Sequence, residues 1–580
     1  MAQHEQINIS AEVSFIWQSA EILRDTYKAH QYQDIILPLV VLRRMECVLL
    51  EEKDKIQQKL GEALKKLAEK DAKKLIDAKL LSSLKFNNLS NFTFKTLSSE
   101  KDVNIKDNFK SYISSFTDNI KKILENFGIS KELNKLEKDK LLYPLIKQYA
   151  ELDLSPKVVS NLKMGYIYEE LIRRFSEQYG EEAGEHFTPR EIIQLMVNVL
   201  VDKQKIADGE LKTIYDPACG TGGMLSIGKE FILEEVNSKA NVVVFGQEKQ
   251  PETWAIGASD MLIKGENAGN IKEGNTLTSD QVPGDKFDYM LSNPPFGVDW
   301  KKDKPDIESD TSGRFHKDRL PRVSDGSTLF LQHMLSKMKP TSQGGSSIAI
   351  VFNGSPLFTG DAGSGESEFR KYLLENDLID CIIALPRDLF YNTGIATYVW
   401  IVRNVKDKKR KDKVQLINAI DFYEKMRKSL GKKNKYITPE QIKKIYDIYE
   451  AFKESEHSKL LDNADLGYTK VNLELTEIDE QGKPVKETIM KKVGGLMKEV
   501  TEVKKKNDSE YVPLNEDIEK YLKKEVELPY TVRSKEIGYE INFSQYFYKY
   551  QPLRKPEIVT KEFENLEKEN ISLLKEIGFV

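Results

Sequence analysis

The sequence predicts an α/β protein in which a mostly parallel sheet with helices on both faces is flanked by helical regions at both ends. From about Leu211, short β-rich runs alternate with helical segments, which is typical of strands joined by crossover helices. Before and after this part, Lys/Glu-rich segments carry apolar residues at helical spacing. We therefore expect a helical domain at 1–160, an α/β domain at 161–420 and a mostly helical region at 421–580.

The central part contains seven runs that we predict to be strands. Each is a short, mostly apolar run, and all except Phe287 to Leu291 contain β-branched residues. The last two runs flank a charged tip, Lys406 to Lys413, and we expect them to pair as a hairpin that gives the sheet an antiparallel edge. The seven runs are Leu211 to Tyr215, Val242 to Gly246, Phe287 to Leu291, Ser347 to Phe352, Ile379 to Leu385, Tyr398 to Arg403 and Val414 to Ala419.

The flanking regions have helical spacing for most of their length. We expect helices over 10–84 and 109–178, separated by a loop over the polar stretch 87–108. Beyond Ala419 the chain is charged and reads as largely helical, with room for a short hairpin between 463 and 508. The final segment, 556–578, has a helical apolar stripe that either packs on its own domain or meets a partner helix. Its residues are Ile558, Phe563, Leu566, Ile571, Leu574 and Ile577.

Composition limits the classes of function. At 580 residues the chain is several times longer than the roughly 150 residues of a typical domain. Its net charge of −4 provides no overall basic field, so any nucleic-acid contact requires local patches or a partner. Three widely spaced cysteines, six histidines without H-x-x-x-H spacing and no long apolar run predict a cytoplasmic protein with no metal site and no membrane contact.

The stretch Leu291 to Gly297 reads L-S-N-P-P-F-G and follows a predicted strand. Pro294 and Pro295 cannot donate to a ladder, but their carbonyls can accept. If the Asn293 side-chain oxygen and the Pro294 carbonyl accept the two hydrogens of an exocyclic amine, its lone pair becomes available for attack. Phe296 would stack on the heteroaromatic ring. The alternative is that Asn-Pro-Pro is simply a turn.

A glycine-rich stretch, Asp216 to Leu225, lies between the first predicted strand and its helix. Glycines there allow the backbone to approach a ligand at the carboxyl end of a strand. The dinucleotide fingerprint fits poorly, because Leu225 occupies the third glycine position. A phosphate loop also fits poorly. Gly223 to Lys229 reads G-x-x-x-x-G-K, but Glu230 replaces the Ser or Thr that would hold Mg²⁺.

Glu248 follows the second predicted strand and is placed to accept hydrogen bonds from ribose hydroxyls. A diphosphate would place negative charge near Asp216 and Glu248. S-adenosylmethionine carries a sulfonium and an ammonium, so the two acids favour this cationic ligand.

The order of these motifs resembles the amino-group DNA methyltransferases, and more closely the modification subunit of Type I restriction-modification systems, an adenine-N6 methyltransferase. The similarity covers nearly the whole chain and includes Lys317 to Pro321, Leu389 to Gly394, Val512 to Ile518 and Gly538 to Ile541. It implies a class I S-adenosylmethionine-dependent fold, Rossmann-like, with a mostly parallel seven-stranded sheet. The motifs in order are Phe187-Thr188-Pro189, Asp216 to Gly223, Glu248, Gly274 to Leu277 and Asn293 to Phe296.

The resemblance also implies a role for each matching residue. The catalytic residues would be Asn293, Pro294, Pro295 and Phe296, and the turn Tyr391 to Gly394 would belong to the side of the target base. Many relatives carry Asp where this chain has Asn275. The residues implied to bind S-adenosylmethionine are Phe187, Thr188 and Pro189 at its methionine end, Asp216, Gly220, Thr221 and Gly222 at its amino-acid and sulfonium region, Glu248 at its ribose, and Asn275 and Leu277 at its adenine.

The implied reaction is methylation of a flipped adenine in duplex DNA. A separate specificity subunit would choose the sequence and dock on the C-terminal region, and a restriction subunit and two copies of this chain would complete the assembly. Two other readings stay open. One is a non-catalytic DNA-binding or scaffolding subunit that keeps the fold, and the other is a protein glutamine-amide methyltransferase, because the catalytic tetrapeptide is shared with that class.

Overall fold

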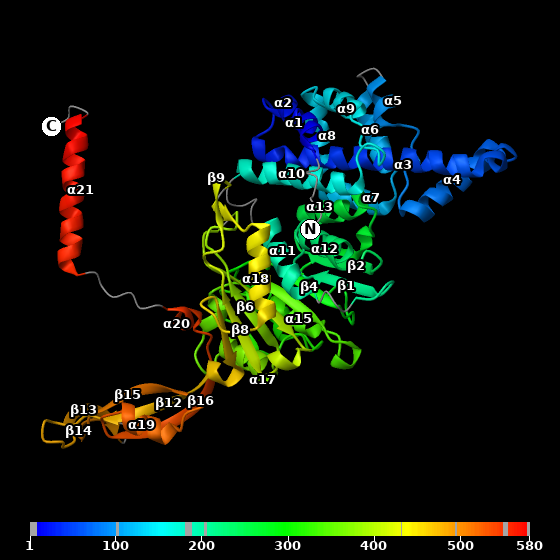
Figure 1. Cartoon of the computed structure of the whole chain (residues 1–580). Helices are drawn as coiled ribbons and strands as arrows, with labels where there is room; N and C mark the ends of the chain where they lie inside the picture. Colours follow the sequence, from blue (N-terminus) through cyan, green and yellow to red (C-terminus); the bar gives the residue numbers. More distant parts are fainter. Residues whose placement is uncertain are drawn as a thin grey trace. The chain divides into compact units, whose positions relative to one another are not determined.

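The computed structural model (Figure 1) describes residues 8–99, 104–179, 188–201, 206–391, 393–430, 432–493, 496–548 and 555–576. The predicted site residue Phe187 and Asn392 of the 391–394 turn lie outside these ranges. The chain forms two compact units, Met1–Ile541 and Asn542–Val580. Within the described ranges, no helix has the length and apolar character needed to cross a membrane. The domain boundaries predicted at 160 and 420 stay predictions.

The N-terminal region is helical, as predicted, but the expected loop over 87–108 contains a helix and the start of another. Phe94 and Leu97 anchor the six-residue helix α5 in the core, and the backbone N–H of Phe94 donates to the Glu46 carboxylate at 2.8 Å. A helix of six residues is too short to show a 3.6-residue period. The helices are α1 (Ser10–Trp17), α2 (Ser19–Leu23), α3 (Gln33–Lys65), α4 (Glu69–Leu84), α5 (Phe94–Ser99), α6 (Ile105–Ser114), α7 (Asp118–Asn126), α8 (Ile129–Lys138), α9 (Leu142–Glu151) and α10 (Asn161–Tyr179).

A nine-stranded sheet forms the centre of the first unit, in the order β11-β8-β6-β7-β5-β4-β1-β2-β3. All seven predicted strands are present in it, and most neighbouring pairs are parallel. Seven strands, from β3 to β6 along this order, form the implied set, and β8 and β11 extend it. The strands are β1 (Leu211–Asp216), β2 (Asn241–Glu248), β3 (Ile271–Glu273), β4 (Tyr289–Ser292), β5 (Ser347–Asn353), β6 (Ile379–Ala384), β7 (Thr397–Arg403), β8 (Lys413–Asn418) and β11 (Ser458–Asp462).

The predicted hairpin between the last two strands is wrong. β7 lies between β5 and β6 and is antiparallel to both, with Trp400 opposite Ile350 on one side and Ile382 on the other. β8 instead pairs with β6 in parallel. The physical reason is burial: β7 is apolar on both faces, so a central position buries it better than an edge would.

Helices cover both faces of the sheet. Gly228 of α12 lies so close to β1 and β4 that an added Cβ would be 3.2 Å from the methyl ends of Ile214 and Leu291. The next residue of β1, Tyr215, points to the other face, where its hydroxyl is 3.0 Å from His333 of α15. The helices of this part are α11 (Arg190–Leu200), α12 (Gly223–Phe231), α13 (Pro251–Ile263), α14 (Lys304–Glu308), α15 (Ser327–Ser336), α16 (Ser355–Phe358), α17 (Gly365–Glu375) and α18 (Pro439–Ala451).

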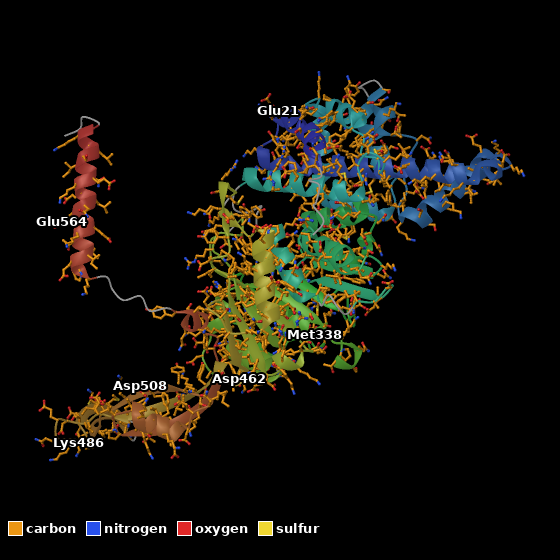
Figure 2. The ribbon with its side chains drawn as sticks, in the orientation of Figure 1. Glu21, Met338, Asp462, Lys486, Asp508 and Glu564 are labelled. Carbon is orange, nitrogen blue, oxygen red and sulfur yellow. The ribbon has the colours of Figure 1, made fainter. Side chains whose placement is uncertain are left out.

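The region beyond Ala419 was expected to be largely helical, and this expectation is wrong up to residue 539, where strands dominate. The predicted hairpin exists as β13 and β14, on the ribbon that includes Lys486 and Asp508 (Figure 2). These strands are charged and exposed, so they lack the alternation of a half-buried strand. The remaining elements are β9 (Glu424–Leu430), β10 (Lys433–Tyr436), β12 (Gly467–Thr476), β13 (Lys486–Val493), β14 (Leu496–Val503), β15 (Lys505–Pro513), α19 (Ile518–Glu525), β16 (Tyr530–Tyr539), α20 (Phe543–Phe547) and α21 (Pro556–Glu576).

Candidate active site

A cavity of about 460 Å³ lies at the carboxyl ends of β1, β2 and β4. Open α/β sheets bind their ligands at this edge. Ten of the predicted site residues line it: Thr188, Asp216, Gly220, Thr221, Glu248, Asn275, Asn293, Pro294, Pro295 and Phe296. Among the described residues, Pro189, Gly222 and Leu277 lie outside this lining.

The glycine-rich loop between β1 and α12 has a backbone shape that favours glycine. Gly220 and Gly222 have φ values of 53° and 83°. The helix α13 packs closely on this loop, and a Cβ added at Gly257 would be 3.1 Å from the Gly220 carbonyl oxygen. The packing of α13 therefore restricts movement of the glycine-rich loop. The stretch considered as a phosphate loop lies largely inside α12, and its Lys229 pairs with Glu266.

Glu248 ends β2, and its carboxylate is fixed by two backbone donors. The N–H of Gly220 donates to Oε2 at 2.9 Å, and the N–H of Gln250 donates to Oε1 at 2.8 Å. These bonds orient the carboxylate at the cavity wall and tie β2 to the glycine loop. Each oxygen keeps a lone pair for a ligand hydroxyl.

Asp216 ends β1 and is 2% exposed. Its Oδ1 accepts from the Ala218 N–H and from the Ser292 hydroxyl, each at 3.0 Å. Burial, with a smaller contribution from the charge of Glu248, raises the pKa of Asp216 to about 7 against the lowering effect of these two bonds. A cation bound in the cavity would favour the ionised form.

The turn Asn275–Leu277 follows β3. Asn275 Oδ1 accepts from the Leu277 N–H at 3.1 Å, and the Thr276 hydroxyl donates to the Pro217 carbonyl at 2.5 Å. Asn275 and Thr276 line the cavity, whereas the Leu277 side chain is buried in a separate apolar cluster. The sequence predicted Asn275 and Leu277 as contacts, whereas Asn275 and Thr276 form the wall of the cavity.

The catalytic candidate Asn293 lies directly after β4. Its Nδ2 donates to the Thr188 hydroxyl at 2.9 Å, which orients the amide. Its Oδ1 is buried and has no hydrogen-bond partner among the described residues. Leaving a buried acceptor without a partner costs about 1–3 kcal/mol, so this oxygen is suited to a ligand donor. Pro294 is buried, Phe296 is half-buried, and Gly297 turns the chain with φ of 62°.

The remaining wall is largely apolar and comes from segments far apart in the sequence. Phe390, Thr393 and Ile395 belong to the loop between β6 and β7, and Phe330 belongs to α15. Sequence reasoning found only Thr393 among these, through the 391–394 turn. It also missed Arg190, which lines the cavity and donates to Glu230 at 2.9 Å. The signal for Arg190 was its position directly after Phe187-Thr188-Pro189.

The donor set of this cavity is suited to an organic ligand. In the part of the chain that the structure describes, no three His, Cys, Asp or Glu side chains come together as metal ligands would. The sheet order and a glycine loop followed by an acid at the end of the next strand define a class I S-adenosylmethionine-dependent methyltransferase. The predicted fold class is thus confirmed, and S-adenosylmethionine is the methyl donor of this class.

Comparison with known proteins identifies the family. The chain belongs to the N-6 DNA methylase family, whose profile matches residues 160–484, and an HsdM N-terminal domain profile matches residues 13–148. The resemblance to Type I modification subunits is confirmed by curated relatives. The MjaIX methylase subunit of a Type I restriction enzyme from Methanocaldococcus jannaschii is 26% identical over 485 residues, which are 81% of this chain and 82% of that protein.

Two further relatives agree. The HindI methylase subunit of a Type I restriction enzyme from Haemophilus influenzae is 30% identical over 259 residues, 44% of this chain and 54% of that one. The crystal structure of a type I restriction-modification methyltransferase subunit from Streptococcus thermophilus superposes with a TM-score of 0.65 at 24% identity. The superposition covers 78% of this chain and 95% of that chain, and it shows the shared fold.

Proposed function

We propose that this chain methylates N6 of adenine in duplex DNA, as the modification subunit of a Type I complex, with the target base flipped into the Asn293–Phe296 site. One observation carries the proposal. The buried Asn293 Oδ1, which has no partner among the described residues, lies at the wall of a cavity with acids on one side and apolar residues on the other. A neutral aromatic amine and a cationic methyl donor would complement these two sides.

The proposed role of Asn293 is to make the amine nucleophilic. Thr188 holds the Nδ2 end of the amide, so Oδ1 is left to accept one amino hydrogen. The carbonyl of Pro294 would accept the second. These acceptors favour a tetrahedral nitrogen over the conjugated planar one, which lowers the barrier to attack. The amino proton is released to water after the new bond forms.

The residues on the other side fit the proposed cofactor. Bound S-adenosylmethionine supplies a methyl group, and the electron pair of the broken carbon–sulfur bond remains on sulfur. Asp216 would lie toward its cationic region and Glu248 toward its ribose hydroxyls, with Asn275 and Thr276 at the adenine. Because Asn275 Oδ1 already accepts from Leu277, its amide N–H groups are suited to a ring nitrogen of adenine. Phe187 would complete the methionine end.

The aromatic side suits a base removed from the duplex. Phe296 would stack on the flipped adenine, and Phe330 and Phe390 would enclose it. Flipping costs a few kcal/mol of unstacking, and stacking on aromatic side chains offsets part of that cost.

We infer that the C-terminal helix α21 contacts the specificity subunit. Its apolar stripe is exposed, with Phe563 63%, Leu566 59% and Ile571 45% accessible. An exposed stripe on an amphipathic helix is suited to a groove or helix of another protein. The near-neutral net charge fits a division of labour in which the specificity subunit chooses the DNA sequence. A restriction subunit and a second copy of this chain would complete the assembly.

The deciding experiment is transfer of tritiated methyl from S-adenosylmethionine to duplex DNA by the chain reconstituted with its specificity subunit. We expect Asn293→Ala to lower the single-turnover rate about a hundredfold or more, by analogy with the loss of one preorganised polar group. The matched variant Asn293→Asp keeps an acceptor and should retain more activity than the alanine variant.

The same assay separates the alternatives. Label in protein glutamine rather than in DNA would indicate the amide methyltransferase. Cofactor binding without label in either substrate would indicate a scaffolding subunit. An Asn293→Ala variant that binds S-adenosylmethionine and methylates at the normal rate would contradict the proposed role of the amide.

A further inference from the structure

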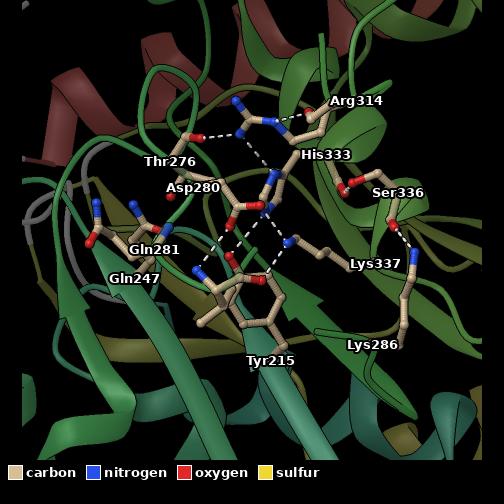
Figure 3. A network of polar contacts seen from close by, with 12 residues as sticks. Tyr215, Gln247, Thr276, Asp280, Gln281, Lys286, Arg314, His333, Ser336 and Lys337 are labelled. Carbon is tan, nitrogen blue, oxygen red and sulfur yellow. Dashed lines mark hydrogen bonds and ion pairs between the residues drawn. The ribbon is translucent and has the colours of Figure 1, made fainter. Parts of the chain in front are cut away.

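A ring of buried polar side chains includes Tyr215, His333 and Arg314 and reaches Thr276 of the Asn275–Leu277 turn (Figure 3). The Tyr215 hydroxyl of β1 is 3.0 Å from Nε2 of His333 in α15. The other ring nitrogen, Nδ1, is 3.3 Å from Nη1 of Arg314. The ring therefore joins strand β1, helix α15 and the segment that follows Asn293–Phe296.

Arg314 connects this ring to the cofactor side of the cavity. Its Nη1 donates to the Thr276 carbonyl at 2.7 Å and its Nη2 donates to the Leu277 carbonyl at 3.3 Å. The Thr276 hydroxyl donates to the carbonyl of Pro217, two residues after Tyr215. The contacts thus lead from Tyr215 of β1 back to the residues that follow β1. The Asn275–Leu277 turn is fixed by Arg314 through its carbonyls and by Pro217 through the Thr276 hydroxyl.

Charges in the ring are compensated. The side chains of Arg314 and Asp310 are each 7% exposed, and Nε of the guanidinium donates to the Asp310 carboxylate at 2.8 Å. Burial lowers the pKa of His333 to about 3, so its imidazole is neutral. Its Nδ1 accepts from Arg314, and its proton is then on Nε2 and donates to Tyr215. Satisfied buried networks of this kind hold a single geometry.

An apolar contact supports the same turn. The Leu277 side chain is 6% exposed and packs in a cluster with Trp300, Ile307 and Phe315. These residues belong to the segment that follows Asn293–Phe296. Both the carbonyls and the side chain of the turn are therefore anchored on that segment.

We propose that Arg314 is a positioning residue for the methyl donor: it holds the Asn275–Leu277 turn in the shape that reads the adenine ring. The inference rests on the proposed function, in which this turn meets the adenine end of S-adenosylmethionine. Arg314 touches neither substrate in this account. It acts through the two carbonyls that it binds.

The test is a ratio of affinities measured without DNA. Calorimetry of the full chain would give dissociation constants for S-adenosylhomocysteine and for S-inosylhomocysteine. In the second compound a keto oxygen replaces the adenine amino group and N1 carries a hydrogen, so this ring nitrogen can no longer accept from the Asn275 amide. We expect the wild type to prefer the adenine compound by about tenfold or more, the worth of one mismatched hydrogen bond. In Arg314→Gln this preference should fall to less than about threefold, with a weaker affinity for S-adenosylhomocysteine.

A second variant addresses folding. Arg314→Gln leaves Asp310 buried without its cation, whereas the double variant Arg314→Gln/Asp310→Asn removes both charges. We expect the same loss of adenine preference in the double variant. The matched control is Arg370→Gln. Arg370 is 1% exposed and also donates to backbone carbonyls, those of Pro356, Thr359 and Gly360, but away from the cavity. Its loss should lower Tm and leave the ratio unchanged.

The outcomes are distinct. A folded double variant that keeps the wild-type ratio would overturn the role of Arg314 and leave the proposed function intact. A wild-type chain that binds neither compound would overturn the proposed function and this inference with it. Loss of adenine preference in both Arg314 variants, but not in Arg370→Gln, would support the inference.

Discussion

At the scale of single residues, the two ends of the cavity differ in how their oxygens are satisfied. Both carboxylate oxygens of Glu248 already accept backbone N–H groups, so this side chain is fixed before a ligand arrives. The oxygen of Asn293 has no partner within the described ranges. The free energy lost by its burial is recovered only when a donor arrives, and an exocyclic amine supplies one. Binding of the base and activation of its nitrogen would then use the same hydrogen bond.

Under the proposed function, we expect Asp216 to make the affinity for S-adenosylmethionine depend on pH. Its pKa of about 7 means that the free protein takes up a proton at this carboxyl as the pH falls below 7. A sulfonium ligand prefers the ionised form. We therefore expect the affinity for S-adenosylmethionine to weaken about tenfold between pH 8 and pH 6, measured by calorimetry. The ligand's own amino group also titrates, so the comparison needs a variant.

The matched variant is Asp216→Asn, which keeps an oxygen that can accept from Ala218 and Ser292. It should bind S-adenosylmethionine more weakly at pH 8, and its affinity should depend less on pH than that of the wild type.

The folding stability of the free protein has the opposite dependence on pH. Because the folded pKa lies above the ordinary 3.8, this group favours the folded state more as the pH falls from 7 toward 4. If the affinity for S-adenosylmethionine had the same pH dependence in the wild type and in Asp216→Asn, this pH dependence would not come from Asp216.

The parts of the site that the sequence predicted are contiguous motifs at strand ends. Asp216, Glu248 and Asn293 each follow an apolar run, and parallel strands bring their carboxyl ends to one edge. Phe330, Phe390 and Arg190 could not be found in this way, because they come from a helix, a loop and a helix start that only tertiary packing brings to the cavity. The role of Thr276 was hidden for a similar reason, since its hydrogen-bond partners Pro217 and Arg314 are distant in the sequence.

At the scale of elements, strands that are buried on both faces were predictable and their order was not. The runs of β5, β6 and β7 are mostly apolar, so they are predicted as strands, but nothing in their local sequence indicates that β7 lies between the other two. The exposed strands β13 and β14 were predicted only as a short hairpin without defined limits, for the opposite reason. Without a buried face they lack a period of two, and their charges resemble a solvated helix.

The packing of α13 on the glycine loop gives a prediction at this scale. In Gly257→Ala, the new methyl group would press on the Gly220 carbonyl and on Thr221, which are backbone atoms that cannot rotate away. Overpacking of this kind costs about 1–3 kcal/mol. Because the displaced atoms belong to the cavity wall, we expect the affinity for S-adenosylmethionine to fall about tenfold in calorimetry.

The matched control is Gly165→Ala in α10, where the added Cβ would meet no backbone atom and only the end of the Lys264 side chain, which pairs with Asp260. Both substitutions raise helix propensity by a similar amount, so their difference reports the contact with the loop. If both variants bind the ligand equally, the glycine loop does not depend on α13.

At the scale of the whole molecule, the N-terminal helices contact the β3 edge of the sheet in the first unit. The Lys122 ammonium of α7 lies 4.8 Å from the centre of the Trp254 ring in α13, and Asn126 donates to Glu273 at the end of β3. β3 leads directly into the Asn275–Leu277 turn. The helical region therefore supports the same edge of the sheet that the proposed function assigns to adenine.

The second unit, Asn542–Val580, gives the prediction for the assembly. Phe563 and Leu566 are exposed on α21, on which Glu564 is labelled in Figure 2. Burying two such side chains at an interface is worth about 3–6 kcal/mol. We expect Phe563→Ser/Leu566→Ser in the full chain to weaken binding of the specificity subunit more than about a hundredfold, and to abolish DNA methylation at low protein concentration. Affinity for S-adenosylmethionine should stay unchanged, because the cavity is formed within Met1–Ile541.

The control for this pair is Lys561→Ser/Lys568→Ser. It places two serines in the same helix, so it lowers helix propensity comparably, but it leaves the apolar stripe intact. Analytical ultracentrifugation with the purified specificity subunit measures the binding, and methyl transfer measures the consequence. Equal binding by both double variants would show that the stripe is not the contact. If Phe563→Ser/Leu566→Ser binds the specificity subunit normally but no longer methylates DNA, α21 would instead contact the DNA. The cavity would not explain this loss, because neither double variant changes a residue that lines it.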